Sequence, residues 1–168
     1  LFHSYDLIGK SSSITKLKEQ INKLTLTESR VFIFGPAGSG KELVARKIHK
    51  NSNRAKKALI ILNGALLDPE KYELELFGSE NSDGTIHYGA FEKASEGILL
   101  IDEVSEIPLK TQAKILRVLT DQKFKRINGH HDINVNVRII CTSSKNMRKE
   151  IDAANFREDL YHRLNVVH

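Results

Sequence analysis

The feature that most constrains this chain is an apolar strand that runs directly into a glycine-rich loop and a lysine. Residues 31–42 read Val-Phe-Ile-Phe-Gly-Pro-Ala-Gly-Ser-Gly-Lys-Glu. The glycines allow backbone N–H groups to turn inward around an anion, and the lysine can reach the outer phosphates of a nucleotide. The sequence therefore predicts a phosphate-binding loop for a nucleoside triphosphate, formed by Gly35, Pro36, Ala37, Gly38, Ser39, Gly40, Lys41 and Glu42.

An ordinary turn followed by a lysine is the alternative interpretation, and the flanking segments argue against it. The strand before the loop is almost wholly apolar, as expected for a strand buried on both faces. After the loop, Leu43, Val44 and Ile48 have helical apolar spacing, with basic residues on the other side. Strand, loop and helix in this order are the context that a phosphate-binding loop requires.

Size, charge and cysteine content indicate one ordinary soluble globular domain. The 168 residues suffice for a full core, and we expect a linker over residues 1–10 and a nucleotide-binding unit over residues 11–168. The basic clusters at 54–57 and 123–126 lack the aromatic residues of a nucleic-acid surface, so the net charge of +5 predicts solvated lysines and not DNA binding. No apolar run is long enough to span a membrane. The single Cys141 predicts an unreactive core thiol and a reducing, cytoplasmic setting.

Segments with strand and helix patterns alternate along the chain. This alternation predicts a three-layer α/β fold, in which helices flank both faces of a mainly parallel five-stranded sheet. The expected strands are 31–34, 59–63, 98–103, 137–141 and one that begins at 165. The expected helices are 14–24, 41–49, 69–77, 109–120, 147–154 and 156–164. An Asn128-Gly129 turn predicts a hairpin between 124–127 and 133–135.

Two acids, Asp102 and Glu103, end the third predicted strand, at the edge where an open parallel sheet places its ligand crevice. In an enzyme with a phosphate-binding loop, the first acid of such a pair supports Mg²⁺ and the second orients or polarises the attacking water. A helix-capping acid pair is the alternative, which the phosphate-binding loop in the same chain disfavours. Glu42 departs from the general pattern, in which a serine or threonine at this position contacts Mg²⁺.

Six motifs together are more specific than any one of them. In chain order they are Gly35-Pro-Ala-Gly-Ser-Gly-Lys-Glu42, Glu75-Leu-Phe-Gly78, Leu100-Ile-Asp-Glu103, Ile115-Leu-Arg-Val-Leu119, Val137-Arg-Ile-Ile140 and Phe156-Arg-Glu-Asp-Leu-Tyr-His-Arg-Leu-Asn165. With them the chain, from about Ile8 to its end, resembles the central AAA+ domain of NtrC-type bacterial enhancer-binding regulators. In that family a glutamate follows the lysine of the loop, which accounts for Glu42.

The resemblance implies further roles at single positions. Asn63 matches the switch residue that holds the catalytic glutamate in check, with a strand-end cap as its ordinary alternative. Ser143 and Ser144 occupy the first sensor region, where the family more often has threonine and asparagine, and the shorter side chains weaken the case for sensing the γ-phosphate. Ile8 and Gly9 match the segment that lines the adenine site, with a core isoleucine beside a turn as the alternative.

Two arginines match those that enter a neighbouring subunit's site in the family. A guanidinium there would stabilise charge spreading over the transferred phosphoryl oxygens. On one continuous helix Arg157 and Arg163 would point about 120° apart, so they are not expected to act identically. We favour Arg163 as this arginine finger, with a local ion pair to Asp159 as the alternative.

One stretch departs from the family pattern. Between Gly78 and Gly89 the family carries an apolar GAFTGA loop that grips the sigma-54 subunit of RNA polymerase, whereas this chain has a shorter polar stretch with a turn signal at Asp83-Gly84. A polar turn offers little apolar area for that contact. The same absence is found in the NtrX branch of the family. We therefore expect an NtrX-like domain that does not remodel sigma-54 polymerase.

The leading functional prediction is the Mg²⁺-dependent ATPase domain of a two-component transcription regulator, which binds ATP and ADP and forms a ring of its own copies. The alternative is a module that binds nucleotide for assembly without useful turnover. A stand-alone P-loop kinase or GTPase is disfavoured, because the sequence carries no signature for an acceptor substrate or for guanine recognition. The resemblance implies a helical lid and a separate DNA-binding domain that these 168 residues do not reach, so we expect a mostly monomeric, weakly active chain. The resemblance does not decide whether the full protein contacts RNA polymerase.

Overall fold

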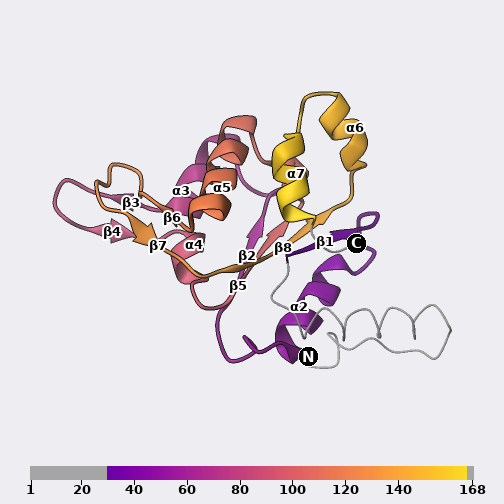
Figure 1. The fold of residues 1–168 in the computed structure, drawn as a ribbon, viewed down its shortest axis with the longest axis horizontal. Helices are drawn as coiled ribbons and strands as arrows, with labels where there is room; N and C mark the ends of the chain where they lie inside the picture. The colour runs from indigo at the N-terminus through magenta and orange to yellow at the C-terminus, as the bar shows by residue number, and fades with distance from the viewer. Residues whose placement is uncertain (1–29, 166–168) are drawn as a thin grey trace.

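Four parallel strands form the central sheet of the computed structural model, which describes residues 30–165 (Figure 1). Their order across the sheet is β1 (Val31–Phe34), β8 (Arg138–Ser143), β5 (Ile98–Asp102) and β2 (Leu59–Asn63). Helical segments separate these strands along the chain, as parallel crossovers require. The C-terminal ends of the four strands therefore meet at one edge of the sheet.

Helices lie on both sides of this sheet in Figure 1, with α2 below it and α3, α5 and α7 above it. The described helices are α2 (Lys41–Asn51), α3 (Tyr72–Phe77), α4 (Ala90–Lys93), α5 (Leu109–Asp121), α6 (Met147–Asp152) and α7 (Glu158–Leu164). Two short 3₁₀ turns, η2 (Pro69–Lys71) and η3 (Val104–Glu106), precede α3 and α5. The predicted α/β class with a parallel sheet between helices is confirmed.

The alternation of side chains along β5 shows why both faces need cover. Ile98 and Leu100 join a buried cluster with Ile48 of α2. Leu99 and Ile101 face the other way and join the larger cluster built with α3, α4, α5 and α7. All four of these β5 side chains are fully buried. A continuous apolar strand is the pattern of a strand covered on both faces, and it fixes β5 and its terminal acids near the middle of the sheet.

Several predicted boundaries shift in the structure. The third predicted strand ends one residue earlier, at Asp102, and the fourth runs on to Ser143. A fifth strand was expected from residue 165, but Asn165 is the C-cap residue that follows the last turn of α7. Residues 166–168 lie outside the described part of the chain, as does the predicted helix 14–24.

Two hairpins project together from one end of the sheet (Figure 1). The predicted hairpin is short, with β6 (Lys123–Phe124) paired to β7 (Ile133–Asn134). The other, β3 (Ser79–Glu80) with β4 (Ile86–His87), occupies the stretch predicted only as a polar loop with a turn. Backbone hydrogen bonds join the two, from Glu80 N to Ile127 O at 3.0 Å and from Ile127 N to Gly78 O at 2.9 Å.

Cys141 lies fully buried in β8, and this burial raises the pKa of its thiol well above the usual range. A thiol that stays protonated is a poor nucleophile, which matches the expected unreactive core cysteine. Within residues 30–165, no helix combines the length and the apolar character needed to cross a membrane.

Candidate functional site

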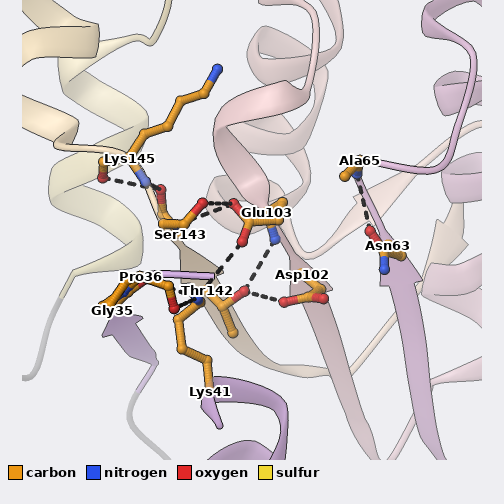
Figure 2. A network of polar contacts seen from close by, with 11 residues as sticks. Gly35, Pro36, Lys41, Asn63, Ala65, Asp102, Glu103, Thr142, Ser143 and Lys145 are labelled. Carbon is orange, nitrogen blue, oxygen red and sulfur yellow. Dashed lines mark hydrogen bonds and ion pairs between the residues drawn. The ribbon is translucent and has the colours of Figure 1, made fainter. Parts of the chain in front are cut away.

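The glycine-rich loop leaves β1 at Gly35 and ends where α2 begins at Lys41 (Figure 2). Gly38 and Gly40 have φ angles of 80° and 86°, in the left-handed region that other residues rarely adopt. A Cβ on either glycine would meet no atom within 4 Å, so the backbone conformation and not crowding calls for glycine. The N-terminus of α2 follows directly, and the partial positive charge of a helix N-terminus favours a bound anion.

The ammonium group of Lys41 is folded into this loop. Its Nζ donates hydrogen bonds to the carbonyl oxygens of Gly35 at 2.8 Å and Pro36 at 2.9 Å. The same atom lies 3.8 Å from Oε1 of Glu103. Because Lys41 is only 7% exposed, these partners replace hydrogen bonds that its ammonium group would otherwise make with water. The lysine therefore links the loop to the acids across the edge of the sheet.

The two acids at the end of β5 have different backbone conformations. Asp102 is the last residue of the strand, whereas Glu103 has φ 56° and ψ 59°. This left-handed conformation costs a non-glycine residue about 1–2 kcal/mol. After the turn, the carboxylate Oε2 of Glu103 accepts hydrogen bonds from the amide of Ser144 at 3.1 Å and from its hydroxyl at 2.9 Å.

Thr142 is a site residue that the sequence-based prediction missed. It lies fully buried on β8, beside both acids (Figure 2). Its hydroxyl donates to Oδ1 of Asp102 and accepts from the amide of Glu103 at 3.1 Å. The one available signal was its position directly before the predicted sensor serines. A threonine in an apolar strand is otherwise typical of any β-strand.

The two predicted sensor serines point to different partners. Ser144 is exposed, and its hydroxyl donates to the carboxylate of Glu103. Ser143 is 1% exposed, and its hydroxyl donates to Lys145 O at 3.2 Å and accepts from Lys145 N at 3.0 Å. Ser143 therefore fixes the turn after β8, and the structure brings only Ser144 to the acids.

Asn63 ends β2 and pairs in register with Asp102. Its side-chain oxygen accepts a hydrogen bond from the amide of Ala65 at 3.0 Å, which is the strand-end cap weighed as the ordinary alternative. Within the described residues, the carboxylate of Glu103 is held by Ser144 and Lys41 instead. The contact implied for a switch asparagine is thus not formed in this structure.

Arg157 and Arg163 do not share one continuous helix, contrary to the expectation. Helix α7 begins at Glu158, and Arg157 is its N-cap residue with an extended backbone. The guanidinium of Arg157 donates to both carboxylate oxygens of Asp159, at 3.0 and 2.8 Å. This pairing raises the pKa of Arg157 and lowers that of Asp159. Because Asp159 is engaged there, the ion pair weighed for Asp159 and Arg163 is not formed.

Arg163 lies in the last turn of α7 and is exposed. Its Nη2 donates to the hydroxyl of Thr120 at 3.0 Å, and its carbonyl oxygen accepts from Arg30 Nη1 at 3.4 Å. Arg30 directly precedes β1. The end of α7 therefore lies by the start of β1, at the end of that strand away from the chain's own glycine-rich loop.

A cavity of about 500 Å³ lies between the loop and the acids, a volume within the range of small-molecule sites. It is lined by Ala37, Gly38, Gly40, Lys41, Glu42, Leu43, Asp102 and Glu103. Of the other predicted nucleotide contacts, Ile8 and Gly9 lie outside the described residues.

The oxygen atoms around this cavity suit Mg²⁺. The carboxylate of Asp102 is the hard ligand that this ion prefers, and the hydrogen bond from Thr142 fixes its orientation. Glu42 lies 3.7 Å from Arg46 in an ion pair along α2, so it does not simply replace the missing hydroxyl. The donor set therefore fits an ion held by one carboxylate together with phosphate and water.

Comparison with known proteins shows to which family this chain belongs. A family model described as the sigma-54 interaction domain matches residues 7–168. The chain belongs to this family. It is 45% identical over 168 residues to the nitrogen assimilation regulatory protein NtrX of Azorhizobium caulinodans, covering 99% of this chain and 37% of that protein. It is 42% identical over 166 residues to the regulatory protein AtoC of Escherichia coli, covering 96% and 36%.

Solved structures agree with this family membership. NtrX from Brucella abortus superposes with a TM-score of 0.92 at 47% identity, covering 95% of this chain and 37% of that one. The same protein in complex with ATP gives 0.91 at 46% identity, covering 96% and 37%. The P-loop NTPase domain of an Escherichia coli sigma-54 activator, at 16% identity and a TM-score of 0.63, supports the fold alone. The chain thus spans just over a third of the length of these NtrX and AtoC proteins.

Proposed function

We propose that this chain is the nucleotide-binding domain of an NtrX-like two-component regulator, and that it binds and hydrolyses ATP. The observation that carries the proposal is the 3.8 Å approach of Lys41 Nζ to Glu103 across one cavity, which joins a phosphate-binding loop to a carboxylate pair. NtrX of Brucella abortus has been crystallised in complex with ATP and with ADP, which supports an adenine nucleotide as the ligand.

Each group at the cavity then has a task. Lys41 would exchange the carbonyl oxygens of Gly35 and Pro36 for phosphate oxygens, since both are acceptors for the same ammonium. Asp102 would hold Mg²⁺, whose charge offsets the charge that develops on the phosphates. Glu103 would orient and polarise the attacking water once its carboxylate is released from Ser144.

Assembly would complete the site. Arg163 lies away from the chain's own loop and is bonded to the neutral hydroxyl of Thr120, so it is available to a neighbouring copy. Arg157 is held by a carboxylate, which makes it the weaker candidate. A guanidinium supplied in trans raises phosphoryl-transfer rates by about 10³–10⁵. The proposed active form is therefore a ring of copies, with activity that rises with assembly.

A second candidate function is a module that binds nucleotide for assembly and turns it over poorly. One observation favours it: both carboxylate oxygens of Glu103 are engaged, one by Ser144 and the other by Lys41. A glutamate tied in this way cannot position water without first breaking those contacts. This alternative differs from the main proposal in turnover and not in binding.

The proposal extends to the partners of the full protein. The hairpin of residues 79–87 is paired to Ile127 by backbone hydrogen bonds, and Ile86, at 39%, is its one exposed large apolar side chain, which supports a domain that does not remodel sigma-54 polymerase. DNA contact would come from another domain, since a relative 40% identical over 166 residues, covering 35% of its own length, is named the DNA-binding transcriptional regulator NtrC. A cytoplasmic location would follow from this role.

The test compares nucleotide binding and phosphate release among the wild-type full-length protein, two test variants and two control variants. Lys41→Ala should lose nucleotide binding, whereas Glu103→Gln should keep binding and lose hydrolysis. Lys50→Ala and Glu106→Gln, at exposed positions of the same two segments, serve as matched controls and should resemble the wild type. Undiminished binding by Lys41→Ala would overturn the proposed site. Binding without turnover in the assembled wild type would favour the assembly module.

A further inference from the structure

The backbone ladder between β5 and β8 ends just before the two acids. Its paired residues run from Ile98 with Arg138 to Ile101 with Cys141. Thr142 is the next residue along β8, and on its other side it pairs with Ile33 of β1. Thr142 therefore lies between the strand that leads into the glycine-rich loop and the strand that ends in the acids.

The side chain of Thr142 takes over where the ladder stops. The amide of Glu103 donates to the threonine hydroxyl at 3.1 Å, and the same hydroxyl donates its hydrogen to Oδ1 of Asp102. A hydroxyl has one hydrogen to donate and lone pairs to accept with, so both acids depend on this one group. Thr142 itself is fully buried, so its hydroxyl is held between the two acids and away from solvent.

Glu103 has a particular need for this support. Its left-handed backbone is strained, and strained conformations persist only where the surrounding contacts determine them. The bond to Thr142 fixes the main chain of Glu103, and the bonds to Ser144 fix its carboxylate. Without the hydroxyl, the partly buried amide of Glu103 would lose its acceptor and the carboxylate of Asp102 would lose its orienting donor.

We propose that Thr142 is a positioning residue for ATP hydrolysis, a role that rests on the proposed function above. Through Asp102 it sets how readily Mg²⁺ joins the bound nucleotide, and through Glu103 it sets the rate of turnover. Thr142 is not among the residues that line the cavity, so its proposed role runs through the two acids. Residues that orient a metal-supporting carboxylate typically change metal affinity or activity by 10–100-fold when they are removed.

The experiment replaces Thr142 with valine, which keeps the branched shape and removes the hydroxyl, and with serine, which keeps the hydroxyl. In the full-length protein, Thr142→Val should bind Mg²⁺-free ATP with the wild-type Kd. The Mg²⁺ concentration that gives half of the maximal increase in nucleotide affinity should rise about tenfold. The kcat of the variant should fall at least about tenfold, with little change in KM. Thr142→Ser should restore both values to within about threefold of the wild type, because it can make the same two hydrogen bonds.

Thr111→Val is the matched control. Thr111 is also fully buried, but within the described residues its hydroxyl has no hydrogen-bond partner. The Thr111→Val variant should therefore keep the Mg²⁺ requirement and the kcat of the wild type. If Thr142→Val does not fold, Thr142→Ala repeats the test with a smaller side chain.

A wild-type Mg²⁺ requirement and kcat in the folded hydroxyl-free variant would overturn the role of Thr142 while leaving the proposed function intact. A wild-type protein that binds no ATP would instead overturn the proposed function itself. Loss of thermal stability alone, with both readouts unchanged, would show Thr142 to be merely structural and would also count against the proposal.

Discussion

The amide nitrogen of Gly64 donates a 2.7 Å hydrogen bond to the carbonyl oxygen of Asp102, and this bond holds the end of β2 close to the end of β5. The approach is so close that a Cβ on Gly64 would lie 2.5 Å from the carbonyl oxygen of Glu103 and 3.0 Å from that of Asp102. Both contacts are with backbone, which cannot move aside as a flexible side chain can. Only glycine fits here, and its absence would displace the peptide that carries the proposed catalytic glutamate.

Substitution of Gly64 by alanine should therefore damage turnover more than binding. We expect a loss of about 1–3 kcal/mol in the free energy of unfolding from overpacking, and a fall in kcat of about 10²-fold from the displaced Glu103. The glycine-rich loop is untouched, so ATP affinity should stay within about threefold of the wild type. Ala65→Ser, at the exposed neighbouring position, is the control for calorimetry and ATPase assays. An unchanged kcat in Gly64→Ala would contradict this account.

The parts of the fold that sequence reasoning predicted well are those with strong local signals. The apolar runs of β1, β2 and β5 fall where they were expected, and β5 is buried on both faces as its continuous apolar sequence predicts. The same burial was expected for β1, but β1 lies at an edge of the described sheet and its Phe34 is 47% exposed. The glycine-rich loop was predictable because its positive φ angles require glycine at Gly38 and Gly40. The acids at the end of β5 followed from the same logic, since parallel strands end at one edge.

The parts that were missed depend on contacts between distant segments. Thr142 matters only because β8 lies beside β5, a relationship that no local pattern encodes. The hairpin of residues 79–87 is paired through Ile127, 40 or more positions along the chain, so its own polar sequence indicated only a turn. Helix α7 begins later than predicted because Arg157, its extended N-cap residue, is held by Asp159 and by the side chain of Gln112.

Gln112 provides the second prediction, because its buried side chain connects three backbone groups. Its amide nitrogen donates to the carbonyl oxygens of Ile107 at 2.8 Å and Asn155 at 3.0 Å, and its oxygen accepts from the amide of Arg157 at 2.9 Å. Gln112→Ala should lower the free energy of unfolding by about 2–3 kcal/mol, since buried groups lose their partners. Chemical denaturation should show this loss, and the exposed Lys110→Ala on the same helix should show almost none.

The pairing of Arg157 with Asp159 predicts a dependence on pH. The hydrogen bonds from Arg157 hold the pKa of Asp159 below its ordinary value of 3.8. A carboxylate whose pKa is lower in the folded state stabilises the fold above its unfolded pKa, and this contribution disappears as the pH falls through the folded pKa. In Arg157→Gln the pKa of Asp159 should rise toward 3.8, measured by NMR titration of the carboxyl carbon. The variant should also lose less stability than the wild type below about pH 4.

A comparison of Arg157→Gln with Arg163→Ala distinguishes the roles of the two arginines in catalysis. If Arg163 is the arginine that acts in a neighbouring copy, Arg163→Ala should lower kcat of the assembled protein by about 10³-fold and leave ATP affinity unchanged. Arg157→Gln should lower it far less, because its guanidinium is committed to Asp159. Mixing Arg163→Ala with Glu103→Gln protein should restore part of the activity, since each supplies what the other lacks. No recovery in such mixtures would argue against an arginine supplied in trans.

Arg126 provides the last prediction, because its guanidinium binds the hairpin of residues 79–87 to the body of the domain. It donates to both oxygens of Glu92 at 2.7 and 2.8 Å and to Glu80 at 2.9 Å, and it lies 5.4 Å from the centre of the Tyr88 ring. These carboxylates raise the pKa of Arg126, so it remains charged at any relevant pH. Arg126→Met should cost about 2 kcal/mol in unfolding free energy.

The same substitution should speed amide hydrogen exchange across residues 79–87 by about tenfold or more, because local opening no longer has to break the charge-assisted bond between Arg126 and Glu80. Lys125→Met is the control, since the side chain of the exposed Lys125 makes, within residues 30–165, only a 3.8 Å ion pair with Asp132. ATP affinity should stay the same in both variants, because none of these residues lines the nucleotide cavity. Equal exchange rates in the two variants would mean that the backbone pairing with Ile127 alone holds the hairpin.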